Sequence, residues 1–249
     1  MSIQSRDVLR GDFHVHSSFS DDARSSIAEN LAAAASNGIS EIRLIDHVRS
    51  STTWVPEFLA EVARAPRHNG LTVRTGIEAK MLNALGELDI PPDLVVGPGG
   101  VDAIVIADHQ FPGTDGAWTP DETRERMAAG LLATDALELL ICALIAAMES
   151  VPLVGDQPTS QLAHCFSILP KIGLAEADLS DAQLAAWANA AASTGTLIEV
   201  NEKWACPEPR SLRAALAAGA TLVASTDAHV ATEVGEYDRV ADILTELWP

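Results

Sequence analysis

Six of the seven histidines in this 249-residue chain fall where short apolar runs end. They are His14, His16, His47, His109, His164 and His229. Carboxylates lie within a few residues of these histidines, and one more, Glu78, ends a further apolar run. The carboxylates near the histidines are Asp12, Asp21, Asp22, Asp46, Asp108 and Asp227. Imidazole nitrogens and carboxylate oxygens are ligands for Zn²⁺, Mn²⁺ or Fe²⁺, and a site of two or three such ions keeps positions open for water and an oxyanion. The residue types therefore predict a centre of two to three divalent transition-metal ions.

The spacing of the first pair has a geometric reason. Residues i and i+2 of an extended segment point to the same side, so His14 and His16 can face one ion while Val15 packs away. One histidine at a strand end is commonly an ordinary polar residue, and the prediction depends on six sharing that position. His68, in a polar segment, is the exception and is expected at the surface.

The elements that must position these residues alternate along the chain. Strands are predicted at residues 11–14, 42–46, 72–78, 103–107, 196–200 and 221–225, and a further one at 152–154 or just before His164. The segments between them are mostly helical. This alternation is typical of a parallel α/β fold, and seven repeats favour a closed or nearly closed barrel over an open doubly wound sheet. The carboxyl ends of barrel strands open on one face, where all six histidines would meet.

Helix boundaries are also readable. Capping boxes at Ser26/Glu29 and Ser180/Gln183 predict helix starts, and Gly38 and Gly195 are placed to end those helices. Residues 85–100 are rich in proline and glycine and predict a loop, and 119–150 predict one or two long helices capped at Asp121.

Composition excludes some functions. A net charge of −19 with only 16 lysines and arginines argues against binding long nucleic acid. The three cysteines, in no paired spacing, predict neither disulfides nor a thiolate zinc site, and favour a reducing cytoplasm. No export signal or membrane segment is expected. Residues 1–249 are expected to form a single barrel-sized domain.

Six segments resemble motifs of the PHP (polymerase and histidinol phosphatase) superfamily, in the order in which that family has them. Residues 12–22 (DFHVHSSFSDD) resemble its opening D-x-H-x-H motif. The later ones are 44–47 (LIDH), 76–78 (GIE), 106–109 (IADH), 162–164 (LAH) and 225–229 (STDAH). Two positions depart from the family pattern: Cys165 stands where a proline is usual, and Asp108 stands at a serine-bearing position. Cys165 is either a ligand or a small core residue, and Asp108 is expected to support a ligand.

The resemblance implies a distorted (β/α)₇ barrel, TIM-like in form, with a trinuclear metal centre. It implies three ligand sets: His14, His16, Glu78 and Asp227 for one ion; Glu78, His109 and His164 for a second; and His47, His229 and either Asp22 or Asp21 for a third. Asp22 is preferred because its offset from His16 fits the family motif.

The implied activity is hydrolysis of a small phosphomonoester or phosphodiester by metal-activated water. Asp227 or His229 is a candidate proton donor to the leaving group. Arg49, Lys80 and Lys203 are candidates for binding the substrate phosphate, or else are solvated surface cations. Trp54 and Trp204 are candidates for stacking on a substrate ring.

Two other functions remain open at this point. An amidohydrolase-type enzyme also opens with H-x-H and would cleave C–N or C–O bonds. A PHP module can also serve as a non-catalytic metal-binding domain.

Overall fold

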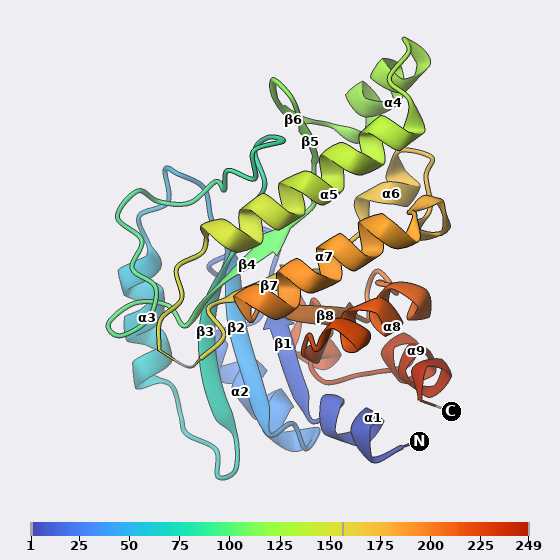
Figure 1. Cartoon of the computed structure of the whole chain (residues 1–249). Helices are drawn as coiled ribbons and strands as arrows, with labels where there is room; N and C mark the ends of the chain where they lie inside the picture. Colours follow the sequence, from blue (N-terminus) through green and yellow to red (C-terminus); the bar gives the residue numbers. More distant parts are fainter. Residues whose placement is uncertain (1, 156, 249) are drawn as a thin grey trace.

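Seven parallel strands form the centre of the computed structural model, which describes residues 2–155 and 157–248 (Figure 1). They are β1 (Gly11–Val15), β2 (Glu41–His47), β3 (Thr72–Lys80), β4 (Ala103–Ala107), β7 (Ser160–Ala163), β8 (Leu197–Asn201) and β9 (Leu222–Ser225). Their order in the sheet is their order in the chain. The helical crossovers between them make this parallel order possible.

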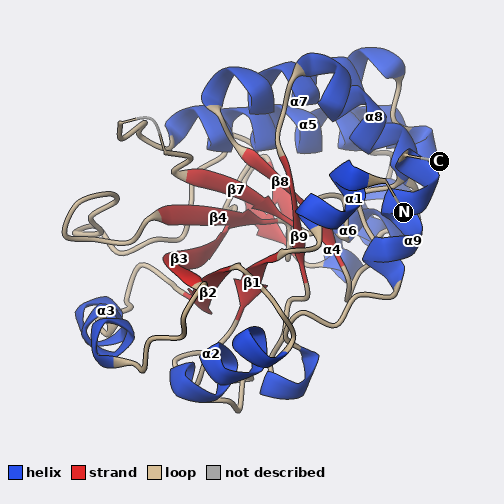
Figure 2. Cartoon of the chain, turned by 90° about the horizontal axis from the view of Figure 1, so that it is seen from below, coloured by secondary structure: helices blue, strands red, loops and turns tan. Residues whose placement is uncertain are grey.

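The two edges of the sheet meet, so the barrel is nearly closed. Val15 at the end of β1 pairs in parallel with Ala228, just beyond β9. The His16 N–H donates to the Ala228 carbonyl at 2.9 Å. Figure 2 shows the strands at the centre with helices around them. The predicted α/β barrel is confirmed.

The helices pack their apolar faces on the outside of the barrel. They are α1 (Ile3–Val8), α2 (Ile27–Ser36), α3 (Val55–Arg64), α4 (Pro120–Ala128), α5 (Ala133–Ser150), α6 (Ile168–Lys171), α7 (Asp181–Thr194), α8 (Pro209–Ala218) and α9 (Arg239–Leu247), with short 3₁₀ turns at Glu176–Asp178 and Ala231–Glu233. Leu137, Leu140 and Leu144 on one side of α5 are buried, as the 3.6-residue period requires. No helix of the described ranges is long and apolar enough to cross a membrane.

The predicted capping boxes at Ser26 and Ser180 are present, and Gly195 ends α7 with a φ of 65°. The predicted cap at Asp121 is wrong. Thr119 caps α4 instead, because its hydroxyl accepts from the Glu122 N–H while the Glu122 carboxylate accepts from the Thr119 N–H. Residues 119–150 form two helices.

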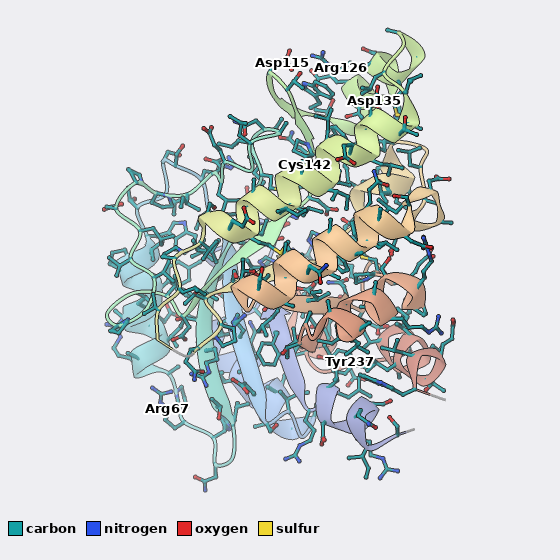
Figure 3. All side chains as sticks on the ribbon, in the orientation of Figure 1. Arg67, Asp115, Arg126, Asp135, Cys142 and Tyr237 are labelled. Atoms are coloured by element: carbon teal, nitrogen blue, oxygen red, sulfur yellow. The ribbon has the colours of Figure 1, made fainter. Side chains whose placement is uncertain are left out.

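One alternative that the sequence left open is decided, and one element was not predicted. The ambiguous fifth strand of the barrel is β7, and Val154 makes only an isolated bridge. The prediction also missed a hairpin of β5 (Phe111–Gly113) and β6 (Gly116–Trp118), which projects with α4 from the top of the barrel in Figure 1. Asp115 and Arg126 form an ion pair at its tip, at 3.2 Å, and both are labelled in Figure 3.

Candidate metal centre

All six predicted histidines meet at the carboxyl end of the barrel. His14 is the next-to-last residue of β1, His16 follows that strand directly, and His47 is the last residue of β2. His109, His164 and His229 lie just after β4, β7 and β9. His68 lies in the loop before β3, at the other end of the strands. The barrel therefore separates the six from the seventh as expected.

Glu78, in β3, lies at the middle of the cluster and is buried. Its Oε2 lies 3.4 Å from the Nε2 of both His14 and His16, and 2.9 Å from His47 Nδ1. This oxygen has no hydrogen-bond partner of good geometry among the described residues. A buried carboxylate oxygen without a donor is rare, because its desolvation is left uncompensated.

The second oxygen of Glu78 faces the other side of the barrel mouth. Oε1 lies 3.1 Å from His109 Nε2 and 3.2 Å from His164 Nε2. Asp108 Oδ1 accepts from the Ser167 hydroxyl and lies 3.3 Å from His164 Nδ1. Asp108 thus supports the far side of the His164 ring, as expected, and leaves Nε2 as the nitrogen that faces Glu78.

The hydrogen bonds around His14 and His16 assign their tautomers. His14 Nδ1 lies 2.9 Å from the Glu199 carboxylate, which can only accept, so Nδ1 carries the proton. His16 Nδ1 lies 3.1 Å from the Ser20 hydroxyl, whose own hydrogen is directed to Asp46 at 2.7 Å, so this nitrogen also donates. When both rings are neutral, both Nε2 atoms present lone pairs, and they lie 2.9 Å apart. Two lone pairs at that distance repel unless they share a proton or a metal ion, so the donor set fits a metal ion.

Asp227 completes this donor group. Its Oδ1 lies 3.4 Å from His16 Nε2 and 3.9 Å from His14 Nε2. Its other oxygen accepts from Trp204 Nε1 at 2.9 Å. The backbone of Asp227 has a φ of 56°, which is uncommon for a residue other than glycine and is found at functional sites.

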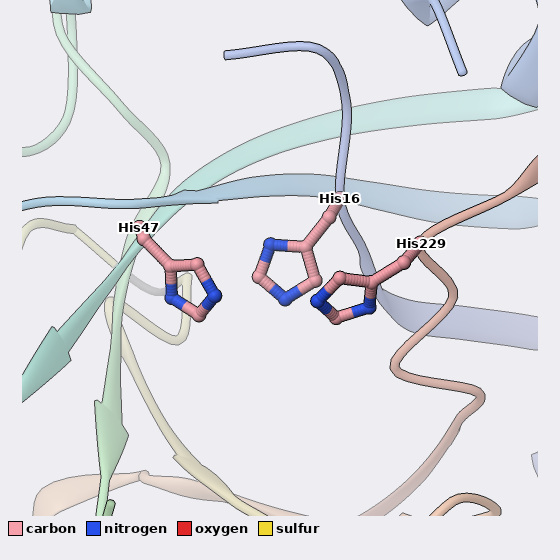
Figure 4. Close-up of side chains that lie close together, drawn as sticks. All are labelled: His16, His47 and His229. Atoms are coloured by element: carbon pink, nitrogen blue, oxygen red, sulfur yellow. The ribbon is translucent and has the colours of Figure 1, made fainter. Parts of the chain in front are cut away.

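A third group lies at the outer edge of the cluster. Figure 4 shows the rings of His16, His47 and His229 close together. Asp22 lies beside them, with Oδ1 3.6 Å from His47 Nε2 and Oδ2 3.2 Å from His229 Nε2. Asp21 lines the same cavity but forms no ion pair with a histidine among the described residues. The geometry therefore supports Asp22 over Asp21.

The charges of the cluster depend on one another. Burial lowers the pKa of His14, but Glu199 and Glu78 outweigh burial and raise this pKa well above its ordinary value. Burial lowers the pKa of His16 to about 3, so its imidazole is neutral at pH 7, the form that binds metal. Burial raises the pKa of Glu78, but His109 and His14 outweigh it and hold this pKa well below the usual range.

Two buried aspartates hold the loops that carry the candidate ligands. Asp12 accepts from the N–H and the hydroxyl of Thr226 and from the Gly235 N–H, which fixes the segment after β9 against β1. Asp46 accepts from the N–H and the hydroxyl of both Ser17 and Ser20. Each is therefore a support for the ligand loops.

A cavity of about 400 Å³ opens above the cluster, and the three predicted phosphate-binding residues all line it. Arg49 is exposed at its rim. Lys80 lies 3.7 Å from Asp89, and Lys203 lies 3.4 Å from Asp227 Oδ2. Trp204 forms part of the wall with 39% of its surface exposed.

Two residues take structural positions instead. Trp54 precedes α3 and packs against Phe19, with ring centroids 5.3 Å apart, so it is not placed to stack on a substrate. Cys165 is buried in the apolar core and belongs to none of the metal-ligating groups of the described residues. Of its two alternatives, the core residue is the one that the structure supports.

The sequence prediction missed Glu199. This side chain has no exposed surface and contacts both ends of the cluster: Oε2 faces His14, and Oε1 accepts from the His164 N–H at 3.2 Å. Asn201 Nδ2 donates to the same Oε1 at 2.5 Å. The available signal was its place in the apolar run LIEVN of a fully buried strand, where a charged residue needs partners.

Comparison with known proteins agrees with this geometry. The family model of the PHP domain matches residues 12–203. A stretch of 108 residues is 33% identical to a protein named probable phosphatase from Vibrio parahaemolyticus, and it covers 41% of this chain and 41% of the relative. A second probable phosphatase, from Vibrio vulnificus, is 34% identical over 88 residues, which cover 33% of this chain and 34% of that one. The matched part is thus under half of each relative.

Two solved structures share the fold. One is the histidinol phosphate phosphatase of Lactococcus lactis, solved with Zn, L-histidinol and phosphate, with a TM-score of 0.61 and 17% identity over 95% of this chain and 91% of that one. The other is a putative histidinol phosphatase from Listeria monocytogenes, with a TM-score of 0.63 and 14% identity over 91% of this chain and 97% of that one. The family match covers about three quarters of the sequence, and so the chain belongs to the PHP domain family.

Proposed function

We propose that this protein, acting as a single catalytic domain over residues 1–249, is a metal-dependent phosphoesterase that hydrolyses a small phosphomonoester or phosphodiester. The observation that carries the proposal is the pair of Nε2 atoms of His14 and His16, which face each other at 2.9 Å beside an oxygen of Glu78 that has no well-aligned hydrogen-bond donor among the described residues. A divalent cation accepts electron pairs from all three atoms at once.

Two to three divalent ions, Zn²⁺, Mn²⁺ or Fe²⁺, suit the three donor groups. The assigned ligands are His14, His16, Glu78 and Asp227; Glu78, His109 and His164; and His47, His229 and Asp22. Bound there, such ions would lower the pKa of a coordinated water towards ~7 and offset charge that develops on the phosphoryl oxygens. Glu199 and Asp108 keep two of these imidazoles in the tautomer that presents Nε2.

The cavity favours a small anionic substrate. Its volume of about 400 Å³ suits a metabolite-sized molecule, and Arg49, Lys80 and Lys203 supply positive charge around its wall. The Lactococcus lactis neighbour was solved with phosphate and a small organic molecule, which supports the same substrate class. The net charge of −19 opposes long nucleic acid as a substrate. Cys142, Cys165 and Cys206 are free thiols, which supports the cytoplasm as the place of action.

Of the two candidate proton donors, His229 is favoured over Asp227. Burial raises the pKa of Asp227, but its contacts with His16 and His14 outweigh burial and lower this pKa below the usual range, so the carboxylate holds no proton at pH 7. His229 can donate only if its Nε2 is free of metal, so its two proposed roles exclude each other at that atom. An alkaline limb in the pH–rate profile unchanged by His229→Gln would exclude the donor role.

The test measures metal content by elemental analysis of protein purified without chelator, together with hydrolysis of p-nitrophenyl phosphate and bis(p-nitrophenyl) phosphate. Wild type is expected to hold two to three equivalents and to hydrolyse at least one ester. His14→Ala is expected to lose metal and activity, whereas His68→Ala, the histidine outside the cluster, is expected to keep both. Bound metal without phosphatase activity would instead favour hydrolysis of C–N or C–O bonds or a non-catalytic module. A metal-free folded protein would contradict the proposal.

A further inference from the structure

A second and larger cavity lies at the opposite end of the barrel from the metal centre. Its volume is about 740 Å³. Its lining comes from the amino ends of the strands, including Glu41 of β2, Leu197 of β8 and Thr221 just before β9. Neither the proposed metal chemistry nor the substrate cavity uses this end of the barrel.

Arg43 lines this cavity and is unusual for a cation. Only 3% of its surface is exposed, and no carboxylate lies within 4.0 Å of its guanidinium among residues 2–155 and 157–248. Nη1 donates to Gln161 Oε1 at 2.5 Å, but Nε has no partner in the same ranges. Arg74, on the next strand, is by contrast half-exposed and paired with Glu41 at 2.9 Å.

Asp102 and Glu41 act on this guanidinium only from beyond ion-pair distance, so its charge is offset in part. A buried arginine is normally paired, because an uncompensated buried charge is costly, and an unsatisfied buried N–H adds a cost of about 1–3 kcal/mol. The structure makes room for the side chain: a Cβ on Gly76 would lie 3.3 Å from Arg43 Cδ, tighter than ordinary contact. Glycine at this position therefore lets the guanidinium occupy the barrel interior.

The wall around Arg43 is mainly apolar. Phe13 lies with its ring centroid 5.3 Å from Arg43 Cζ, and Val154, Leu197 and Val223 complete the apolar lining. Two carboxylates also line the cavity, Glu41 and Asp102, and each is already paired or hydrogen-bonded within the chain. Both still act on Arg43 from a distance, and so they oppose a ligand with more than one negative charge.

We propose that this cavity binds a small organic monoanion, a carboxylate with an apolar body, whose charged group pairs with the Arg43 guanidinium. The carboxylate supplies a charged partner for the guanidinium, and the body packs against Phe13 and the aliphatic wall. The site is independent of the proposed phosphoesterase activity.

A purely structural role for Arg43 makes a different prediction. Gln161 links Arg43 to Glu199, since Gln161 Nε2 donates to Glu199 Oε2 at 2.8 Å. If Arg43 only offsets the charges of Asp102, Glu41 and Glu199, its replacement would lower stability, and the cavity would bind no anion.

The experiment is isothermal titration calorimetry of the metal-loaded protein with sodium benzoate, and with benzamide as the neutral analogue of the same shape. The variants are Arg43→Met, which removes the charge, and Thr221→Trp, which fills the cavity from an exposed position without losing a side-chain hydrogen bond. Arg67→Met, in an exposed loop, is the control, and circular dichroism checks that each variant is folded.

We expect benzoate to bind the wild type and Arg67→Met equally. Its affinity for Arg43→Met and for Thr221→Trp should be at least tenfold lower. Benzamide should bind the wild type at least tenfold more weakly than benzoate does. If Arg43→Met does not fold, the result with Thr221→Trp decides. If benzoate binds the wild type and Thr221→Trp equally, its site lies elsewhere, such as at the metal centre, and the proposal is overturned. Absence of benzoate binding to the wild type would overturn it as well.

Discussion

His14 Nδ1 lies 2.9 Å from Glu199 Oε2, and neither side chain has any exposed surface. The carboxylate fixes the proton on Nδ1 and increases the basicity of Nε2, the nitrogen that faces the proposed metal. Glu199→Gln is expected to weaken metal binding about 10-fold and Glu199→Ala about 100-fold, because loss of such a partner typically costs 10–100-fold in affinity. Competition with a chelating dye measures the affinity. Glu208→Gln, at an exposed carboxylate without a side-chain cap bond, is the control. Unchanged affinity in Glu199→Ala would contradict this role.

Removal of metal should destabilise the fold. A ligand present at 1,000 times its Kd stabilises the native state by about 4 kcal/mol, and each kcal/mol shifts the Tm of a chain of this size by about 2–4 °C. Excess EDTA is therefore expected to lower the Tm by about 10 °C, and added Zn²⁺ or Mn²⁺ to restore it. His68→Ala should show the full shift and His14→Ala a reduced one by scanning calorimetry. A Tm that EDTA leaves unchanged would argue that no ion is bound.

The cations of the substrate cavity should affect binding more than turnover. Arg49→Met and Lys203→Met are expected to raise KM for an aryl phosphate about tenfold, as loss of a charge-assisted contact of about 1.4 kcal/mol predicts. Steady-state kinetics check this, with Arg67→Met as the control. Figure 3 shows Arg67 on the side of the molecule away from the hairpin. An unchanged KM in both variants would identify these residues as ordinary surface cations.

One buried carboxyl outside the centre should make stability depend on pH. Burial raises the pKa of Glu176 from 4.5 to about 7, although the Ser211 hydroxyl and the Glu208 N–H donate to it. The folded protein thus binds this proton more tightly than the unfolded chain, so stability is lost as pH rises from 4.5 through about 7.

Glu176→Gln cannot ionise and should abolish that loss. The free energy of unfolding of the variant minus that of the wild type is expected to rise by on the order of 1–3 kcal/mol from pH 5 to pH 8. Urea denaturation at the two values measures this. Glu125→Gln, at an exposed position on α4, should show no such gain, and an equal response of both variants would contradict the assignment.

Much of the candidate centre could be predicted because it depends on local order. Alternation along a strand directs His14 and His16 to one side, and parallel strands bring residues such as Glu78 and Asp227 to the same end of the barrel. These two rules need no knowledge of which side chains touch. The hairpin at residues 111–118 was missed because Pro112 and two glycines obscure its short strands.

The sequence by itself determined the barrel and the set of side chains at its mouth, because strand period and strand direction are local properties of the chain. Only the tertiary structure decided which of them meet: Glu199 contacts His14 from 185 residues away, and Asp22 rather than Asp21 faces His47 and His229. It also decided that Arg43 lies inside the barrel with no carboxylate at ion-pair distance among the described residues. Such contacts depend on how the sheet closes, on strand register and on side-chain volume across strands far apart in sequence, and local pattern contains none of these.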